Sequence, residues 1–328
     1  MLKTRLNNFI KRLQNKFSKL LLSAKIKLKW LTDKLYLPLT SEHYELYDII
    51  HRHYWNQLHD FPNLINCRDF NDKIQWLKLF DQSPEIVRCS DKILVRDDVR
   101  QGVGEEYLVK LYQVHDHFSE IDFDSLPQSF VLKTNHDSGT VILVRDKSQL
   151  DYQATAERIE VSLKNTYGWA SGEWAYSYIE PKVFVEEFIE PENNSPPPDF
   201  KMQCVDGEMK FCRYTYDRGI DTKEIVLDKY ANNFGFLIDE NFKLGDKNDF
   251  KKPKLWEKMI FLAETLSKDF KCVRVDLYCS KDQIYVGEMT FFPMMGCYKG
   301  EGQKKLGKYL DFDRTTFKPF ILDQLKKS

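Results

Sequence analysis

The sequence has 328 residues, of which 42% are hydrophobic and 14% aromatic, and its formal net charge is −1. This composition excludes a largely disordered chain, and the near-neutral charge gives the whole protein no general attraction to nucleic acid. Length alone predicts about two domains. The seven cysteines are scattered and form no C-x-x-C pair, which argues against a zinc ribbon or a disulfide framework and favours reduced thiols in a cytoplasmic protein.

The first 34 residues form a basic segment with a helical apolar pattern. They contain ten lysines and arginines and a single acid, Asp33. Apolar residues recur at steps of three and four, which predicts an amphipathic helix: Leu2, Leu6, Phe9, Leu13, Phe17, Leu20 and Leu21. No apolar run is long enough to span a bilayer or to form a signal peptide. Either this helix lies on an anionic membrane surface, or it docks on its own domain or on a partner.

Residues 41–125 are predicted to be mainly helical. The stretch 70–80 has helical periodicity with Asn71 as its N-cap, and 90–104 is expected to be one helix that opens at its initial Ser-Asp pair. Another helix is expected over 43–60. It carries three histidines that do not share the face of a helical metal site and are predicted to lie at the surface: His51, His53 and His59.

From residue 126 onward the pattern changes to strands separated by turns. The strand-like segments cover 129–134, 140–146, 181–189 and 200–216. Two helical segments, over 148–168 and 253–270, lie among them, and the Pro-rich stretch 190–200 is expected to be a loop inserted between two strands. This order predicts an α+β protein built around antiparallel sheets, with a helical N-terminal segment.

A hydrophobic hairpin near the C-terminus carries polar side chains where a packed sheet would prefer apolar ones. Strand alternation puts Arg274 and Asp276 on one face of the first strand, and Glu288 and Thr290 on one face of the second. A three-residue loop within 280–283 would bring both pairs to the same side, with Glu288 opposite an arginine or an aspartate. Such carboxylates either bind Mg²⁺ bridged to phosphates or belong to a structural ion pair.

Three further positions carry charges beside strand ends or helix starts. Lys133 ends a strand and precedes a small-residue turn, 135–140, which is either a phosphate cradle or an ordinary hairpin turn. Glu186 and Glu187 end a buried strand, where they either contact a purine nucleoside or simply reach solvent. Lys92 lies near a predicted helix start, where the helix macrodipole makes a lysine unfavourable unless an anion is bound nearby.

The order Lys92, Lys133, Glu186 and then the acidic hairpin resembles that of the ATP-grasp superfamily, in particular the D-alanine–D-alanine ligases. More closely, the motifs FNDKIQWLKL, DKILVR, LPQSFVLKTNHDSGT and VRVDLY…IYVGEMTFFPMMG are similar to those of the TupA-like ATP-grasp family, over roughly residues 60–310. The resemblance implies an ATP-grasp fold, in which two α+β subdomains clamp ATP. It divides the chain into a basic arm, a helical domain, the two subdomains and a tail: 1–40, 41–125, 126–190, 191–310 and 311–328.

The resemblance also assigns roles to individual residues. It implies that Arg274 and Lys133 are catalytic: Arg274 matches the arginine that stabilises the transferred phosphoryl group, and Lys133 matches one of the two lysines that hold the ATP phosphates. The implied ATP-binding residues are Lys92, Lys133, Asn135, Ser138, Gly139, Glu186, Glu187, Phe188, Ile189, Asp199 and Lys201. Asp276, Glu288 and Thr290 match the magnesium ligands, although the ligases commonly have Asn at the last of these positions and Thr is a weaker ligand.

The reaction implied by the resemblance joins a carboxylate to an amine. ATP would phosphorylate the carboxylate, and the amine would displace phosphate from the resulting acyl phosphate. Because TupA-like proteins are associated with bacterial surface polysaccharides such as capsule, teichuronopeptide or O-antigen, the expected substrates are a uronic-acid-type carboxylate on a polymer or lipid-linked precursor and an amino acid or amino sugar. Acceptor-side candidates, chosen because cations suit carboxylates, are Arg213, Arg218 and Lys299.

Three other functions remain open at the level of the sequence. The triplet DFD, at 122–124 and 311–313, has the spacing that binds a metal and sugar nucleotide in glycosyltransferases. A kinase that stops at the phosphorylated product would need the same ATP-binding residues. A non-catalytic ATP-binding scaffold is disfavoured because Arg274, Asp276 and Glu288 are all present.

Overall fold

The computed structural model describes residues 2–190, 197–219, 221–318 and 321. Its α-helices are α1 (Leu2–Asp33), α2 (Tyr44–Leu58), α3 (Phe70–Phe80), α4 (Pro84–Ser90), α5 (Val95–Gly102), α6 (Tyr152–Lys164), α7 (Trp256–Ser267) and α8 (Gly302–Gly307). Its strands are β1 (Leu111–His115), β2 (Phe130–Thr134), β3 (Val141–Val144), β4 (Val183–Glu187), β5 (Asp199–Val205), β6 (Glu208–Tyr216), β7 (Lys223–Leu227), β8 (Lys243–Leu244), β9 (Cys272–Ser280) and β10 (Gln283–Thr290). Short 3₁₀ helices are η1 (Ser41–His43), η2 (Glu105–Tyr107), η3 (Phe118–Glu120), η4 (Lys147–Gln149), η5 (Trp169–Ser171), η6 (Trp174–Tyr178) and η7 (Pro293–Gly296).

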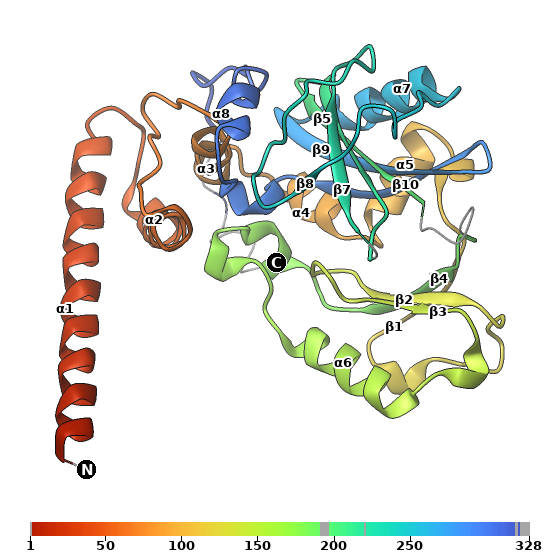
Figure 1. Cartoon of the computed structure of the whole chain (residues 1–328), viewed down its shortest axis with the longest axis horizontal. Coiled ribbons are helices and arrows are strands. Elements are labelled where there is room, and N and C mark those ends of the chain that lie inside the picture. The colour runs from red at the N-terminus through yellow and green to blue at the C-terminus, as the bar shows by residue number, and fades with distance from the viewer. Residues whose placement is uncertain (1, 191–196, 220, 319–320, 322–328) are drawn as a thin grey trace.

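The strands form two sheets, one with the order β1-β4-β2-β3 and one with the order β10-β9-β5-β6-β7-β8. In Figure 1 the four-stranded sheet lies below the six-stranded sheet, and α1 and α2 stand together at one end of the molecule. All strand pairs are antiparallel except β7 and β8. The α+β class expected from the sequence is therefore confirmed.

The smaller sheet carries a core of its own. Buried residues from β2 and β4, including Phe130, Leu132 and Val185, pack with Ile159 of α6. Its edge strand β1 lies inside the range 41–125 that the sequence predicts to be mainly helical. Because β1 pairs with β4, that part of the range belongs structurally to the sheet.

In the larger sheet β9 is the second strand from one edge, and it pairs with β5 on one side and with the edge strand β10 on the other. One face of β9 is apolar, with Val273, Val275 and Leu277 fully buried together with residues of α7 such as Met259. The other face carries the polar residues Arg274 and Asp276. This alternation agrees with the sequence prediction, and it turns the charged side chains away from the main core.

The N-terminal helices differ from the sequence prediction at their ends. The N-cap of α3 is Asp69, whose side chain accepts a hydrogen bond from the backbone of Asp72. Asn71 is buried instead, and it exchanges hydrogen bonds with the backbone of Tyr298. The range 90–104 is not one helix, because Ser90 ends α4 and a turn precedes α5.

The surface position predicted for the three histidines is wrong for His51. Its ring is fully buried, stacks on Tyr47 at a centroid distance of 3.8 Å, and Nδ1 lies 2.8 Å from the Tyr47 carbonyl oxygen. Burial lowers the pKa of His51 to about 3. His53 is half-buried and His59 is exposed. None of the described residues forms a group of three or more His, Cys, Asp or Glu side chains that could hold a metal ion.

A buried lysine joins α3 to the chain that follows β10. Lys78 Nζ donates hydrogen bonds to the carbonyl oxygens of Ser171 and Met295, at 2.9 and 2.7 Å. The second acceptor belongs to a tight turn in which Met294, Met295 and Gly296 all have positive φ. The turn therefore depends on side-chain donors for its backbone carbonyls. Burial lowers the pKa of Lys78 to about 8.

Lys78 should consequently give the protein a measurable pH dependence. Because its pKa is lower in the folded chain than in the unfolded chain, the unfolded chain binds more protons between about pH 8 and pH 10.5. The Lys78 contribution to the free energy of unfolding should therefore rise with pH in this window, by at most about 1.4 kcal/mol per pH unit. Urea unfolding measures the free energy of unfolding of the wild type and of Lys78→Met. The value for the wild type minus the value for Lys78→Met should increase between pH 8 and pH 10. Substitution of the exposed Lys247 by Met should give a difference independent of pH, and the same result for Lys78→Met would contradict the prediction.

Candidate active site

A cavity of about 270 Å³ brings together residues that are far apart in the sequence. Its walls come from the four-stranded sheet, from β5, β9 and β10, and from the segment before α5. The lining includes most of the residues singled out in the sequence: Lys92, Lys133, Ser138, Gly139, Glu186, Glu187, Phe188, Ile189, Asp199, Lys201, Arg218, Asp276 and Glu288. The structure thus places these residues around one space, while their individual roles remain predictions.

One wall of this cavity is apolar, and sequence reasoning missed it. Val131 and Leu143, which face each other across β2 and β3, line the cavity with Val109 and Val141. The Arg145 guanidinium lies 5.1 Å from the centre of the Phe188 ring. Strand alternation offered a usable signal, because Val131 shares the face of Lys133. A flat aromatic base suits a wall of this kind.

Two lysines of the cavity are held by neighbouring groups, one by β4 and one by the turn between β2 and β3. Lys133 forms an ion pair with Glu186 of β4. Lys92 donates a hydrogen bond to the carbonyl oxygen of Asp137 in the turn. The Asp137 carboxylate accepts hydrogen bonds from Thr134 and Ser162, at 2.6 and 2.7 Å. Burial alone would raise the pKa of Asp137, but these hydrogen bonds outweigh it and the pKa is lowered. An anionic side chain therefore fixes the shape of this turn.

Asn135 does not occupy the position that the resemblance implied. It is buried below the turn, where Nδ2 donates to Asp91 and to the Glu180 carbonyl oxygen, both at 3.0 Å. Its Oδ1 accepts from the backbone of Lys182 at 2.7 Å. An amide side chain can satisfy several buried backbone groups at once. Asn135 thus supports the turn from beneath and does not line the cavity, in place of the direct contact with ATP that was expected.

The acidic side of the cavity is the hairpin of β9 and β10. Asp276 lies directly opposite Glu288, and Arg274 directly opposite Thr290. Arg274 binds the Asp276 carboxylate through two hydrogen bonds of 2.6 Å, and its Nη2 lies 3.1 Å from Thr290 Oγ1 and 3.6 Å from Glu288 Oε1. The polar face of the hairpin is thus one connected network. Asp276 and Glu288 line the cavity, whereas Arg274 and Thr290 lie behind them and do not.

Charge pairing keeps the buried members of this network ionised. Burial alone would raise the pKa of Asp276, but the positive charges of Arg274 and Lys201 outweigh it, and the pKa is lowered. Burial alone would lower the pKa of Arg274, but Asp276 raises it well above its usual value. Asp276 is therefore an anion at neutral pH, held between two cations.

A second carboxylate, Asp199, lies beside the hairpin. Its Oδ2 lies 2.9 Å from both Lys201 Nζ and Arg218 Nη1, and Lys201 Nζ lies 3.3 Å from Asp276. The buried Oδ1 of Asp199 has no hydrogen-bond partner among the described residues. A buried acceptor without a partner is costly, and a ligand hydroxyl in the cavity could satisfy it.

The hairpin suits Mg²⁺ bound together with phosphates. Asp276 and Glu288 supply hard carboxylate oxygens from rigid, directly paired strands, and Mg²⁺ commonly takes one or two carboxylates with phosphates and water completing its six ligands. About one third of the Glu288 side chain is exposed, which leaves it accessible from the cavity. Thr290 fits less well, because its hydroxyl accepts from Arg274 and stands outside the cavity lining.

The three acceptor-side candidates do not lie together. Arg218 lines the cavity. Arg213 is buried, pairs with Glu224 at 2.6 Å and donates to the Tyr298 hydroxyl at 2.7 Å, so the structure gives it no access to a substrate in this cavity. Lys299 lines a separate cavity of about 620 Å³ between α2 and α8.

An aromatic segment next to the hairpin was also missed. Tyr176 is buried, and burial together with the charge of Glu288 raises its pKa well above the usual value. Burial likewise raises the pKa of Glu173, which accepts a hydrogen bond from Ser171 at 2.9 Å. The sequence GWASGEWAYSY, rich in glycine and aromatic residues, was the available signal. These groups place polar side chains beside the acidic hairpin, outside the lining of the cavity.

A model of the protein family described as TupA-like ATPgrasp matches residues 72–311. The chain belongs to the TupA-like ATP-grasp family. The resemblance seen in the sequence motifs and the expected ATP-grasp fold are therefore confirmed. The matched range contains both sheets and every lining residue of the cavity. It leaves α1 and α2 outside.

Three solved structures that are similar to this TupA-like chain are distant from it in sequence. A D-alanine–D-alanine ligase from Bacillus anthracis, complexed with ATP, is 18% identical, with 63% of this chain and 56% of that chain covered and a TM-score of 0.38. A RimK domain ATP-grasp protein from Sphaerobacter thermophilus is 14% identical, with 74% and 76% covered and a TM-score of 0.38. The ATP-grasp ligase PsnB, complexed with a minimal precursor, is 11% identical, with 70% and 61% covered and a TM-score of 0.36. No curated protein matches, and similarity at this level carries no argument about substrates.

Proposed function

We propose that this chain is an ATP-dependent carboxylate–amine ligase that acts through an acyl phosphate. The observation that carries the proposal is the single cavity with two lysines on one wall and two directly paired carboxylates, Asp276 and Glu288, on the other. Family membership supports the same chemistry. The apolar wall around Val131 and Phe188 would bind adenine, and Asp199, with its unpartnered oxygen, would accept a ribose hydroxyl.

Catalysis would rest on positioning and on charge. Lys92 and Lys133 would bind the phosphates, and the backbone of Ser138 and Gly139 would cover them. Mg²⁺, when bound by Asp276 and Glu288, would neutralise charge on the phosphates. The positive charge of Arg274, fixed behind these carboxylates, would stabilise the phosphoryl group in transfer.

The two chemical steps balance without a protein nucleophile. A carboxylate oxygen of the substrate attacks the γ-phosphorus of ATP, the bond from that phosphorus to the bridging oxygen of ADP breaks, and ADP leaves. The amine nitrogen then attacks the acyl carbon, the bond from that carbon to the phosphate oxygen breaks, and phosphate leaves as the nitrogen loses a proton. The products are an amide, ADP and phosphate.

The proposed substrates are a uronic-acid-type carboxylate on a surface polysaccharide or its lipid-linked precursor, and an amino acid or amino sugar. Of the acceptor-side candidates, Arg218 is the one that lines the cavity, where its guanidinium would suit a substrate carboxylate; it also forms an ion pair with Asp199. A lipid-linked precursor would bring the enzyme to the inner face of the membrane.

A screen for ADP release tests this function. The purified chain, with Mg-ATP, is incubated with panels of uronic acids and amines, and Asp276→Asn is the inactive control. ADP release that requires both substrates, with the amide found by mass spectrometry, supports the ligase. If ADP release requires the carboxylate alone and yields a stable phosphorylated product, the protein is a kinase and not a ligase.

The two triplets behind the glycosyltransferase alternative both lie in described parts of the chain, away from the cavity. In the first DFD triplet, Asp122 Oδ1 accepts from the backbone of Asp124 at 3.1 Å within an exposed turn. In the second, Asp313 accepts from the backbone and hydroxyl of Thr315. Neither triplet lines the cavity. We expect Mg-ATP to raise the melting temperature of the protein, and a uridine diphosphate sugar to leave it unchanged.

A further inference from the structure

Helix α1 is attached to the rest of the protein along one face only. Ile26 and Trp30 are buried, and the Trp30 ring packs edge-on against Tyr44 and Tyr47 of the next helical segment, at 5.2 and 4.9 Å. Asp33 is also buried and accepts a hydrogen bond from the Tyr47 hydroxyl at 2.8 Å. The helix is therefore held to α2 in a fixed rotation about its own axis.

The opposite face of α1 exposes large apolar side chains. With about 100° between successive residues of an α-helix, the exposed leucines and phenylalanine fall within a stripe about 100° wide, on the side opposite Ile26: Phe17, Leu20, Leu21, Leu28 and Leu31. Leu28 is 68% exposed. In the turn after the helix, Leu35 and Tyr36 are exposed as well. The apolar pattern seen in the sequence begins nearer the N-terminus than these residues. Its first four side chains are not among those that the structure describes: Leu2, Leu6, Phe9 and Leu13. We call the five side chains of α1 the outer stripe.

Lysines border the outer stripe on both sides. Lys16 and Lys27 lie along one edge and Lys25 along the other, and all three are exposed. The single acid of the segment, Asp33, is buried and is paired with Lys29 at 3.3 Å. The exposed surface of α1 is thus apolar in the middle and positive at its edges, with no exposed carboxylate among residues 1–34.

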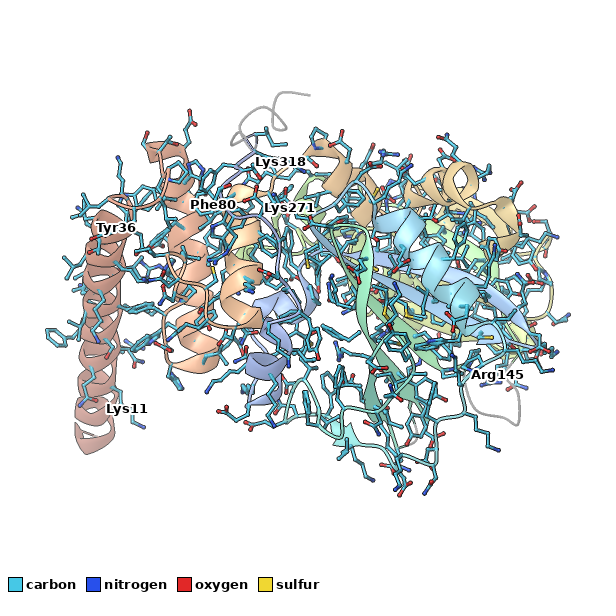
Figure 2. All side chains as sticks on the ribbon, turned by 90° about the horizontal axis from the view of Figure 1, so that it is seen from above. Lys11, Tyr36, Phe80, Arg145, Lys271 and Lys318 are labelled. Carbon is cyan, nitrogen blue, oxygen red and sulfur yellow. The ribbon has the colours of Figure 1, made fainter. Side chains whose placement is uncertain are left out.

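Both views place α1 at an outer edge of the molecule. Figure 2 shows Lys11 and Tyr36 along this edge, with Arg145 of the candidate active site near the opposite edge. Figure 1 shows the N-terminal part of α1 extending beyond α2. A large flat partner could therefore cover the outer stripe without blocking the cavity.

We propose that α1 binds the surface of a bilayer that contains anionic lipids. The outer stripe would enter the boundary between headgroups and acyl chains, and the bordering lysines would contact lipid phosphates. No helix among the described residues is long and apolar enough to cross a membrane. A second copy of α1 fits the stripe less well, because lysines would face lysines along both edges with no exposed acids to pair with them. This proposal does not depend on the ligase activity.

Flotation with vesicles tests the proposal on the full chain. Vesicles of phosphatidylcholine containing about one third phosphatidylglycerol should bind the wild type at least about tenfold more strongly than vesicles of phosphatidylcholine alone. Raising the salt concentration should weaken this binding. The double variant Leu20→Glu/Leu28→Glu places two acids in the outer stripe and should reduce binding by about tenfold or more.

The matched control is Asn15→Glu/Ser18→Glu, which adds the same charge at exposed positions outside the outer stripe. It should lose clearly less binding than Leu20→Glu/Leu28→Glu, because the electrostatic attraction falls off within a Debye length of the lipid surface. Unchanged thermal unfolding of both variants would show that the fold is intact. If the two double variants lose the same amount of vesicle binding, the loss is explained by net charge alone and the proposal is overturned. A wild type that does not bind the vesicles would also overturn the proposal. If that wild type is a dimer in sedimentation velocity and Leu20→Glu/Leu28→Glu is a monomer, the outer stripe binds a second copy of the chain instead.

Discussion

The Asp276→Asn variant is expected to lose ATP-dependent turnover by roughly 10³-fold, at the upper end of the effect of removing one preorganised electrostatic group. Asp276 lines the cavity, is fully buried, and is kept anionic by Arg274 and Lys201. Asparagine has a similar shape but no charge, so it would neither hold Mg²⁺ well nor balance Arg274. The rate of ADP release under saturating substrates measures the effect.

The same substitution should also lower stability, and the two effects can be separated. Removal of one partner from a buried ion pair costs about 3–5 kcal/mol, and the remaining contact of Arg274 with Glu288, at 3.6 Å, favours the lower end. Turnover is therefore measured below the melting temperature of the variant. Glu288→Gln changes a more exposed carboxylate and should lose turnover with a smaller loss of stability. Glu208→Gln, at the exposed start of β6, should alter neither, and Asp276→Asn that stays folded and retains more than a tenth of wild-type turnover would contradict the proposed role.

The hairpin shows how far strand alternation alone can predict a site. The sequence placed the charged side chains of the two strands on one face by assuming a three-residue loop. The structure has a two-residue loop, Lys281 and Asp282, both with positive φ, as in a tight hairpin turn. That loop alone would set Asp276 opposite Gly287. A bulge between Val286 and Glu288 adds the missing residue and restores the pairing of Asp276 with Glu288.

Gly287 is the residue that makes this bulge possible, and no local pattern indicated it. A side chain there would place its Cβ 2.5 Å from the ring of Tyr278. The shared face of the charged side chains was thus predicted correctly from the polar residues themselves. The bulge that produces this arrangement depends on a contact between the two strands. Bulges of this kind commonly aim side chains next to functional sites.

The residues that were misplaced share a different cause. Asn135, Arg213 and His51 are polar, and the sequence assigned them to a ligand or to solvent. Each is buried, with partners from segments distant in the chain or from its own helix: Asp91 for Asn135, Tyr298 for Arg213 and the Tyr47 carbonyl for His51. Polar groups are buried when tertiary contacts satisfy them, and a sequence without its fold does not reveal those contacts.

Lys133→Met is the second substitution with a large expected effect, and it tests the opposite wall of the cavity. A hydrogen bond to a charged group contributes about 1.5–3 kcal/mol, so loss of the lysine should weaken Mg-ATP binding by about tenfold to a hundredfold. Titration calorimetry with a non-hydrolysable ATP analogue measures this change. The affinity for adenosine should change little, because its base and ribose are proposed to contact the apolar wall and Asp199.

The ion pair with Glu186 complicates a single substitution. Lys133→Met leaves the buried Glu186 without its cation, and the repulsion between this carboxylate and the phosphates would itself weaken binding. In Lys133→Met/Glu186→Gln that repulsion is absent, so its remaining loss reports on the lysine alone. Glu186→Gln by itself frees Lys133 for the phosphates and should not weaken their binding. If the double variant bound the analogue as tightly as Glu186→Gln does, Lys133 would be a partner of Glu186 only, and the phosphates would have to bind elsewhere in the cavity.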